Sequence, residues 1–424
     1  MTATRTVSYK LYPSAAQEAA LGAKLGMLRD LYNAALQERR DAWRLSGVSV
    51  RLSDQEKALK TVRAEIGGWL GLVHTHEAQT VLKRLDLAFA AFFSRLKAGG
   101  KPGFPRFKGR DRFPGWGYKE HRNGFRLETR EGWRHGHVTL FGVGRMRVRG
   151  VARTPGRILK ADVMRKAAGW FMSVVVETDC AEREAATGPA GGLDWGVATY
   201  ATLALDDGTF EEVPNPRHLD AEAEAIREEQ RSLSRLGRER KRSGRAQREA
   251  KRKLARRHAK VAARRKDFLH KLTARLAARH PLIATERLGV RGMTASARGT
   301  AADPGRNVAQ KAGLNGSILD AAPAAFLNML RYKAEEAGSR FLEADTRRLR
   351  PSQRCPDCGE IRKKALSERR HACPCGCDLG RDEAAALVLL RWGLDEAARL
   401  RAAAEAPGDG HPAGTVGPKA ARAA

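Results

Sequence analysis

Five of the six cysteines in this chain of 424 residues lie in one short segment, from Cys355 to Cys377. Cys355 and Cys358 form a CxxC knuckle, and a second group of thiols follows at Cys373, Cys375 and Cys377. Two thiolate pairs at this separation are typical of a tetrahedral zinc ribbon. Such a segment has little apolar core, so metal binding would supply its folding energy. We predict Zn²⁺ bound by Cys355, Cys358, Cys373 and Cys375, with Cys377 as the alternative to Cys375.

Three acidic residues lie in strand-like or strand-adjacent contexts. Asp194 lies in Gly-Leu-Asp-Trp-Gly, Glu286 follows the apolar strand that ends in Ala-Thr, and Asp382 precedes a helix of small residues. Each alone is typical of a cap or a surface charge. Mg²⁺ prefers oxygen ligands, and two such ions roughly 4 Å apart can hydrolyse a phosphodiester. The common placement of the three acidic residues favours a magnesium site for phosphodiester chemistry.

The charge of the chain indicates the partner. Lys and Arg number 79 against 48 Asp and Glu, which gives a formal charge of +31 and a pI near 10.6. Such an excess favours a nucleic acid, whose phosphates dominate the affinity. No apolar run approaches the roughly 18 residues of a membrane span, and the N-terminus has no signal-peptide pattern. We therefore expect a cytoplasmic protein with no membrane partner.

Two segments are candidates for the nucleic-acid contacts. The loop 101–110 alternates aromatic and cationic residues, a pattern that suits both base stacking and phosphate binding; an ordinary surface loop with two buried rings is the alternative. The helical region 219–279 has 17 Lys and Arg but 3 Asp and Glu between residues 231 and 270, for which a solvated face or a disordered tail is the alternative. The candidate residues are Phe104, Arg106, Phe107 and Lys108 in the loop and Arg252, Arg256 and Lys260 in the helices.

Local patterns predict several elements. Ser14 and Gln17 have the spacing of a capping box before a periodic apolar stretch, which predicts a helix over 15–44. A second helix is expected over about 76–97. Alternating apolar residues predict strands at 158–165 and 170–178, joined as a hairpin.

In combination these motifs resemble TnpB, the OrfB protein of insertion-sequence transposons, which is related to the type V CRISPR effectors. The resemblance runs from about residue 5 to 392. It rests on segments that fall in family order: the Pro13 to Gln17 start, Tyr32-Asn33, Gly103-Phe-Pro-Arg-Phe-Lys108, Gly192-Leu-Asp194, Thr285-Glu286, Pro351-Ser-Gln-Arg-Cys355-Pro-Asp-Cys358-Gly and Arg381-Asp382.

The resemblance implies a multidomain α+β and α/β fold. An N-terminal β-barrel, called the wedge, would carry a helical recognition insert and precede an RNase H-like RuvC domain interrupted by a basic helical hairpin and a zinc ribbon. The implied boundaries are 1–12 and 98–182 for the wedge, 13–97 for the insert, 188–350 for the first RuvC part with the hairpin at 219–279, 351–378 for the ribbon, 379–396 for the last RuvC part and 397–424 for a disordered tail.

The resemblance also implies an activity, namely RNA-guided cleavage of double-stranded DNA next to a short adjacent motif. Asp194, Glu286 and Asp382 would be the catalytic carboxylates, holding two Mg²⁺ ions or Mn²⁺ in their place. The guide RNA would derive from the transposon end, and we expect no strand transfer by the protein itself. Gly380 and Ala384 depart from the family pattern, which has Asp and Asn there. The alternatives are a nuclease-inactive RNA-guided repressor and a compact type V CRISPR effector.

Overall fold

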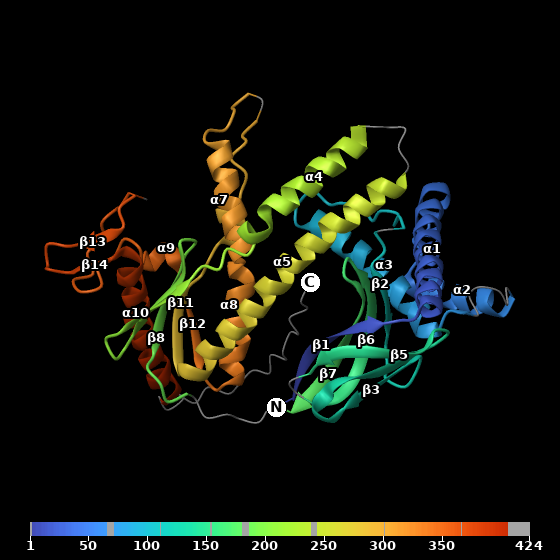
Figure 1. Cartoon of the computed structure of the whole chain (residues 1–424), viewed down its shortest axis with the longest axis horizontal. Helices are drawn as coiled ribbons and strands as arrows, with labels where there is room; N and C mark the ends of the chain where they lie inside the picture. Colours follow the sequence, from blue (N-terminus) through green and yellow to red (C-terminus); the bar gives the residue numbers. More distant parts are fainter. Residues whose placement is uncertain are drawn as a thin grey trace. The chain divides into compact units, whose positions relative to one another are not determined.

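The computed structural model describes residues 2–65, 72–110, 112–152, 155–179, 186–238, 244–300, 302–365 and 367–405. The chain divides into two compact units, the first within residues 1–181 and the second beginning at residue 182 (Figure 1). Both units combine helices and strands, which confirms the expected mixed α and β architecture.

The first unit is built on a seven-stranded antiparallel sheet in its described residues, with strand order β2-β6-β7-β1-β5-β4-β3. The sheet is curled, and the description as a closed barrel stays a prediction. The hairpin expected at 158–165 and 170–178 is β6 with β7. The strands are β1 (Thr2–Tyr12), β2 (Gly115–Tyr118), β3 (Phe125–Arg130), β4 (Arg134–Leu140), β5 (Gly144–Val151), β6 (Arg157–Lys166) and β7 (Gly169–Asp179).

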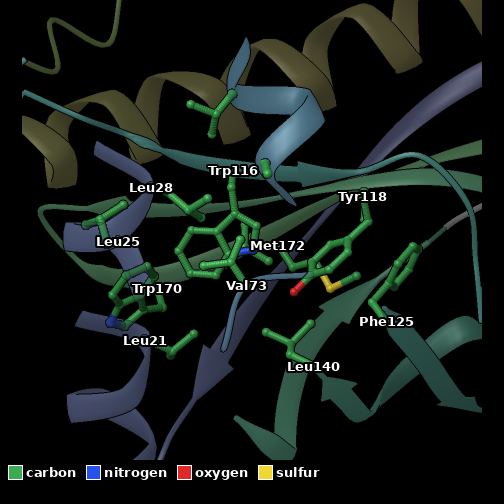
Figure 2. Packing of buried hydrophobic residues seen from close by; sticks show 14 of the residues in the cluster. Leu21, Leu25, Leu28, Val73, Trp116, Tyr118, Phe125, Leu140, Trp170 and Met172 are labelled. Atoms are coloured by element: carbon green, nitrogen blue, oxygen red, sulfur yellow. The ribbon is translucent and has the colours of Figure 1, made fainter. Parts of the chain in front are cut away.

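Three helices are inserted between β1 and β2. They are α1 (Ala15–Ser46), α2 (Leu52–Glu65) and α3 (Thr75–Lys97). The expected capping box is present: Ser14 Oγ accepts from the Gln17 backbone N–H at 3.3 Å, and Gln17 Oε1 accepts from the Ser14 backbone N–H at 3.0 Å. The apolar face of α1 packs on the sheet, where Leu21, Leu25 and Leu28 lie near Trp116 and Trp170 (Figure 2).

The second unit contains a five-stranded sheet with order β10-β9-β8-β11-β12. The first three strands form an antiparallel meander, whereas β11 runs parallel to both β8 and β12. Parallel pairing requires a crossover connection, and helices supply both crossovers here. The strands are β8 (Gly191–Trp195), β9 (Thr199–Leu205), β10 (Phe210–Pro214), β11 (Leu282–Glu286) and β12 (Arg340–Ala344).

Helices cover both faces of this sheet. One face packs against α5 and α8 through a core that includes Leu272, Ile283 and Phe326, and the other packs against α10 through Leu282 and Leu390. The expected basic hairpin corresponds to α4 and α5, which lie side by side (Figure 1); residues 239–243 between them are outside the described residues. The helices are α4 (Ala223–Arg238), α5 (Gly244–Arg279), α6 (Val290–Met293), α7 (Val308–Ala321), α8 (Pro323–Glu336), α9 (Thr346–Leu349) and α10 (Arg381–Glu405).

The prediction of a disordered tail over 397–424 is wrong for its first part. α10 continues without interruption to Glu405. Alanine has the highest helix propensity, so the Ala-rich stretch after residue 397 extends the helix. Residues 406–424 lie outside the described residues.

The remaining strands form a small two-stranded sheet, β13 (Arg370–Ala372) with β14 (Asp378–Gly380), between β12 and α10 in the sequence. In the part of the chain that the structure describes, no helix has the length and apolar character needed to cross a membrane.

Candidate metal centres and nucleic-acid surfaces

Asp194 and Glu286 lie at the carboxyl ends of two neighbouring parallel strands. β8 and β11 pair with Leu193 opposite Thr285, so the next residue on each strand is an acid. The Thr285 hydroxyl donates to the Leu193 carbonyl oxygen at 2.9 Å, which ties the strands together just before the two acids. Because parallel strands end at the same edge of a sheet, both carboxylates reach one edge.

Asp382 lies in the first turn of α10, which approaches the sheet closely through glycine. A Cβ on Gly192 would lie 2.2 Å from the carbonyl oxygen of Ala386, and a Cβ on Gly393 would lie 2.3 Å from the Cβ of Ala284. Both distances are far below van der Waals contact. The glycines therefore set how close α10 lies to β8 and β11, and with it the position of Asp382.

The three carboxylates interact electrostatically. Burial, and then the charges of Glu286 and Asp382, raise the pKa of Asp194 well above its usual range, while the charge of Arg381 opposes this increase. Burial also raises the pKa of Glu286, partly offset by the hydroxyl of Thr346. Like charges held together in a partly buried site favour a bound cation that neutralises them.

The spacing of the carboxylates differs from that of the thiols. Within the described residues, all groups of three or more His, Cys, Asp or Glu side chains with ligand atoms within 4.8 Å of one another lie in the cysteine cluster. The carboxylates are therefore spread more widely than the ligands of one small ion. Their oxygen donors suit Mg²⁺, which usually keeps several waters.

Arg381 connects the carboxylates to the segment between the cysteine pairs, and sequence reasoning gave it no role. Its Nη1 donates to the carbonyl oxygens of Ala365 at 2.9 Å and Glu368 at 3.3 Å. Its backbone N–H donates to the Arg369 carbonyl oxygen at 2.9 Å. The only signal in the sequence was its place directly before Asp382.

The two positions that depart from the family pattern lie beside Asp382. The backbone N–H of Gly380 donates to the carboxylate of Glu383 at 2.8 Å, so Glu383 caps the start of α10. Ala384 is buried, with 1% of its surface exposed. Both positions are thus packed or hydrogen-bonded, and neither adds an oxygen ligand from its side chain.

Four of the five clustered thiols form one compact group. The sulfur atoms of Cys355, Cys358, Cys373 and Cys375 all lie within 4.8 Å of one another. Two pairs are separated by 3.6 Å, Cys355 with Cys375 and Cys358 with Cys373. Tetrahedral zinc with Zn–S bonds near 2.3 Å places its sulfurs about 3.8 Å apart. The cysteine cluster therefore fits a zinc ribbon.

Cys377 belongs to a second group with Cys355 and His371. His371 is buried, and its Nδ1 contacts Nζ of the buried Lys364. Sequence reasoning missed His371, although its place two residues before Cys373 was a signal. Cys355 is common to both groups, so a single metal ion bound to Cys355 would be coordinated by the residues of one group and not by those of both.

The loop 101–110 exposes its aromatic rings. Phe104 is 46% exposed and Phe107 is 43% exposed, so the alternative of two buried rings is wrong. Arg106 is exposed, and the backbone of Lys108 is fixed to Asn33 of α1 by two hydrogen bonds of 3.0 and 2.8 Å.

The three candidate cations of α5 differ in their surroundings. Arg252 and Arg256 are exposed and form no ion pair with another described residue. Lys260 forms an ion pair of 2.5 Å with Glu222, a carboxylate that also pairs with Arg257 and is 6% exposed. Two of the three are thus available to a partner without breaking an ion pair between described residues.

Three family models match successive parts of the chain: "Helix-turn-helix domain" at residues 1–47, "Probable transposase" at 173–297 and "Cas12f1-like, TNB domain" at 324–389. The last range includes the cysteine cluster and Asp382. In the described residues 2–47 the chain forms the strand β1 and the single helix α1, so this part contains no helix-turn-helix.

Relatives match almost the whole chain. A protein of Streptomyces pristinaespiralis named "Putative RNA-guided DNA endonuclease" is 32% identical over 413 residues, which cover 96% of this chain and 91% of that protein. The similarly named InsQ of Escherichia coli (strain K12) is 29% identical over 378 residues, 88% of each chain. A solved chain in "Cryo-EM structure of the Cas12f1-sgRNA-target DNA complex" covers 92% of this chain and 98% of its own length, with a TM-score of 0.52. At 12% identity, this last similarity shows the fold alone.

Proposed function

Because this chain belongs to the TnpB/OrfB family, we propose that it is an RNA-guided endonuclease that cleaves double-stranded DNA next to a short adjacent motif. The observation that carries the proposal is the meeting of three acids from β8, β11 and α10, where burial and like charge raise the pKa of Asp194. A site of this kind needs cations, and the net charge of +31 favours a nucleic acid as the substrate.

Asp194, Glu286 and Asp382 are the proposed catalytic carboxylates. They would hold two Mg²⁺ ions, or Mn²⁺ in their place, which supply an activated water and stabilise the leaving oxygen of the phosphodiester. The strands β8 and β11 fix two of these acids, and the packing of α10 fixes the third. Arg381, which two carbonyl oxygens hold beside them, balances part of their negative charge.

The fold supports the same proposal. The sheet of the second unit, with parallel β8, β11 and β12 and helices on both faces, suits an RNase H-like RuvC domain. We assign the curled sheet of the first unit to the wedge and α1 to α3 to the recognition insert. The ribbon would bind structural Zn²⁺ through Cys355, Cys358, Cys373 and Cys375.

The nucleic-acid partners are proposed to be a guide RNA from the transposon end and a double-stranded target. Base pairing between them would read the sequence, and the protein would bind backbone shape. The proposed contact residues are aromatic and cationic side chains of two surfaces: Phe104, Arg106, Phe107 and Lys108 in the loop and Arg252 and Arg256 on α5. Lys260, predicted together with them, is held in an ion pair with Glu222 and is therefore not proposed as a phosphate contact.

Cleavage by the purified ribonucleoprotein tests the proposal. The protein is prepared with RNA from its native locus and incubated with Mg²⁺ and a plasmid library that carries the guide-matched target beside random flanking sequence. We expect the wild type and Asp395→Ala, an exposed acid on α10, to cut next to one short motif. Asp194→Ala should bind the same RNA without cutting.

The repressor alternative has its own outcome in this experiment. Gly380 and Ala384 supply no side-chain oxygen beside Asp382, and this observation favours the repressor. Target binding without cleavage by both the wild type and Asp194→Ala would overturn the endonuclease proposal in its favour. Cutting by Asp194→Ala at the wild-type rate would show that the chemistry lies elsewhere.

A further inference from the structure

Four phenylalanine rings form a partly exposed cluster in the first unit. Phe89, Phe92 and Phe93 lie on α3, and Phe104 lies in the loop that follows. Phe104 meets Phe89 and Phe92 edge-on, with ring centroids 5.5 and 5.3 Å apart, and Phe93 meets them at 6.4 and 5.1 Å. We call these four rings the aromatic patch. Its outer rings are half open to solvent, because Phe93 is 52% exposed and Phe104 is 46% exposed.

The patch is held in place before any partner binds. The two hydrogen bonds between Asn33 and Lys108 fix the end of the loop to α1, and Pro105, within the loop, is buried. The guanidinium group of Arg40 lies 5.2 Å from the ring centre of Phe107, a cation–π contact that holds a third exposed ring of the loop. The exposed rings are therefore a preformed surface, which lowers the entropic cost of binding.

The chain segment that carries the patch has charges of one sign, and the nearby Asp86 is paired with Arg39 and Lys83. Residues 87–110 contain six Lys and Arg residues and no Asp or Glu. None of the six forms an ion pair with another described residue of the chain. This complementarity selects a polyanion. The six cations are Arg95, Lys97, Lys101, Arg106, Lys108 and Arg110.

Exposed rings among cations also indicate which form of nucleic acid would bind. In a duplex the faces of the bases are stacked on one another, so a protein ring reaches only unpaired bases. Stacking on aromatic side chains with phosphates on nearby cations is how single strands are bound without sequence preference. A surface that bound only duplex backbone would gain nothing from Phe93 and Phe104.

We propose that the aromatic patch binds an unpaired segment of the guide RNA, with bases stacked on Phe93 and Phe104 and phosphates on the surrounding cations. The identity of the strand rests on the proposed function. A guide RNA must stay bound before, during and after cleavage, so it needs contacts apart from the carboxylates. The patch fits this need, because it belongs to the first unit and the carboxylates to the second.

Fluorescence anisotropy with three probes tests this inference on the full chain, without Mg²⁺ or target DNA. The probes are a 12-nucleotide oligoadenylate RNA, the corresponding DNA oligomer and a 12-base-pair RNA duplex, all at one high salt concentration that weakens phosphate contacts. The test protein is the double variant Phe93→Leu/Phe104→Leu, which keeps apolar side chains but removes two flat rings. Phe210→Leu, at a ring 38% exposed in β10, is the matched control.

We expect the double variant to bind the single-stranded RNA about tenfold more weakly than the wild type, since stacking contributes substantially for each base. Its affinity for the duplex should stay within about twofold, and Phe210→Leu should match the wild type. Equal melting temperatures would show that the variant is folded, and Phe93→Tyr/Phe104→Tyr, which keeps both rings, should restore the RNA affinity.

Three results would overturn the inference: an equal loss for RNA strand and RNA duplex, no loss for either, or a larger loss for the DNA oligomer than for the RNA. A concentration-dependent dimer of the wild type that the double variant abolishes would also overturn it, because a second copy would then cover the patch. The cleavage test is independent. If the wild type cuts DNA but the double variant binds RNA normally, only the proposal for the patch is refuted. If the double variant loses RNA affinity but the wild type does not cut, only the endonuclease proposal is refuted.

Discussion

Asp194 is buried beside two other carboxylates, those of Glu286 and Asp382. Holding its charged form in this position lowers the stability of the fold. Its pKa in the metal-free protein is raised well above the usual range, by burial first and then by Glu286 and Asp382. A carboxyl group with a higher pKa in the folded chain binds more protons when folded, in the pH interval between its unfolded and folded pKa values. Stability therefore falls as the pH rises through that interval, and a bound cation reverses the loss.

Asp194→Asn should therefore stabilise the metal-free protein while abolishing its activity. In magnesium-free buffer without chelator, so that zinc is retained, we expect the variant to melt at least about 2 °C above the wild type at about pH 8. The difference should shrink as the pH is lowered through the raised pKa of Asp194. Thermal melting at several pH values measures this, with Asp395→Asn as the control. A variant that melts below the wild type at about pH 8 would contradict the prediction.

At the scale of elements, the contact between β8 and α10 positions Asp382. Gly192→Ala would place a Cβ 2.2 Å from the Ala386 carbonyl oxygen and 2.3 Å from the Leu390 nitrogen, so the helix must move. We expect a loss of about 1–3 kcal/mol in unfolding free energy, together with a large loss of cleavage. Chemical denaturation and cleavage assays measure both. Gly316→Ala in α7, where a Cβ would meet nothing within 4 Å, should be neutral or slightly stabilising.

The cysteine cluster makes a prediction about metal content. Because Cys375 lies with Cys355, Cys358 and Cys373 and Cys377 does not, Cys377→Ser should retain about one zinc ion per chain, as expected for one tetrahedral site. Cys375→Ser should lose most of its zinc and melt at a lower temperature, since β13 and β14 have three residues each. Elemental analysis of the purified proteins decides the matter. The opposite pattern would assign the fourth ligand to Cys377.

Periodic signals in the sequence were sufficient for the local elements. The capping box at Ser14 predicted the start of α1, because it depends on residues three apart. What the sequence could not give depends on distant contacts. Nothing near Gly192 reveals that α10 packs on it, and nothing near Arg381 reveals its carbonyl partners. The tail was misjudged because an Ala-rich composition without apolar periodicity resembles disorder, whereas alanine extends a helix that packing has already begun.

At the scale of the whole molecule, only part of the net charge of +31 is available to a nucleic-acid partner. Many cations are already paired within the protein: Arg257, Lys260 and Arg264 surround Glu222, and Arg275 and Arg279 pair with Glu211. These pairs hold α5 against neighbouring elements. Cations that form no ion pair with another described residue, such as Arg252 and Arg256, can replace the counterions of a nucleic acid. Net charge alone therefore overstates the number of phosphate contacts.

Salt dependence separates the two classes of cation. For Arg252→Gln/Arg256→Gln, the slope of log affinity against log salt for a short DNA duplex should decrease in magnitude by roughly 1.8, or about 0.9 for each phosphate that the variant no longer neutralises. For Lys260→Gln, the slope should stay close to that of the wild type while the melting temperature falls, because Glu222 loses a partner at 2.5 Å. Anisotropy titrations over a range of salt concentrations, with melting curves for each protein, measure both quantities. Equal changes in slope per substituted residue would mean that Lys260 leaves Glu222 when nucleic acid binds, and that the ion pairs of α5 are exchanged for phosphate.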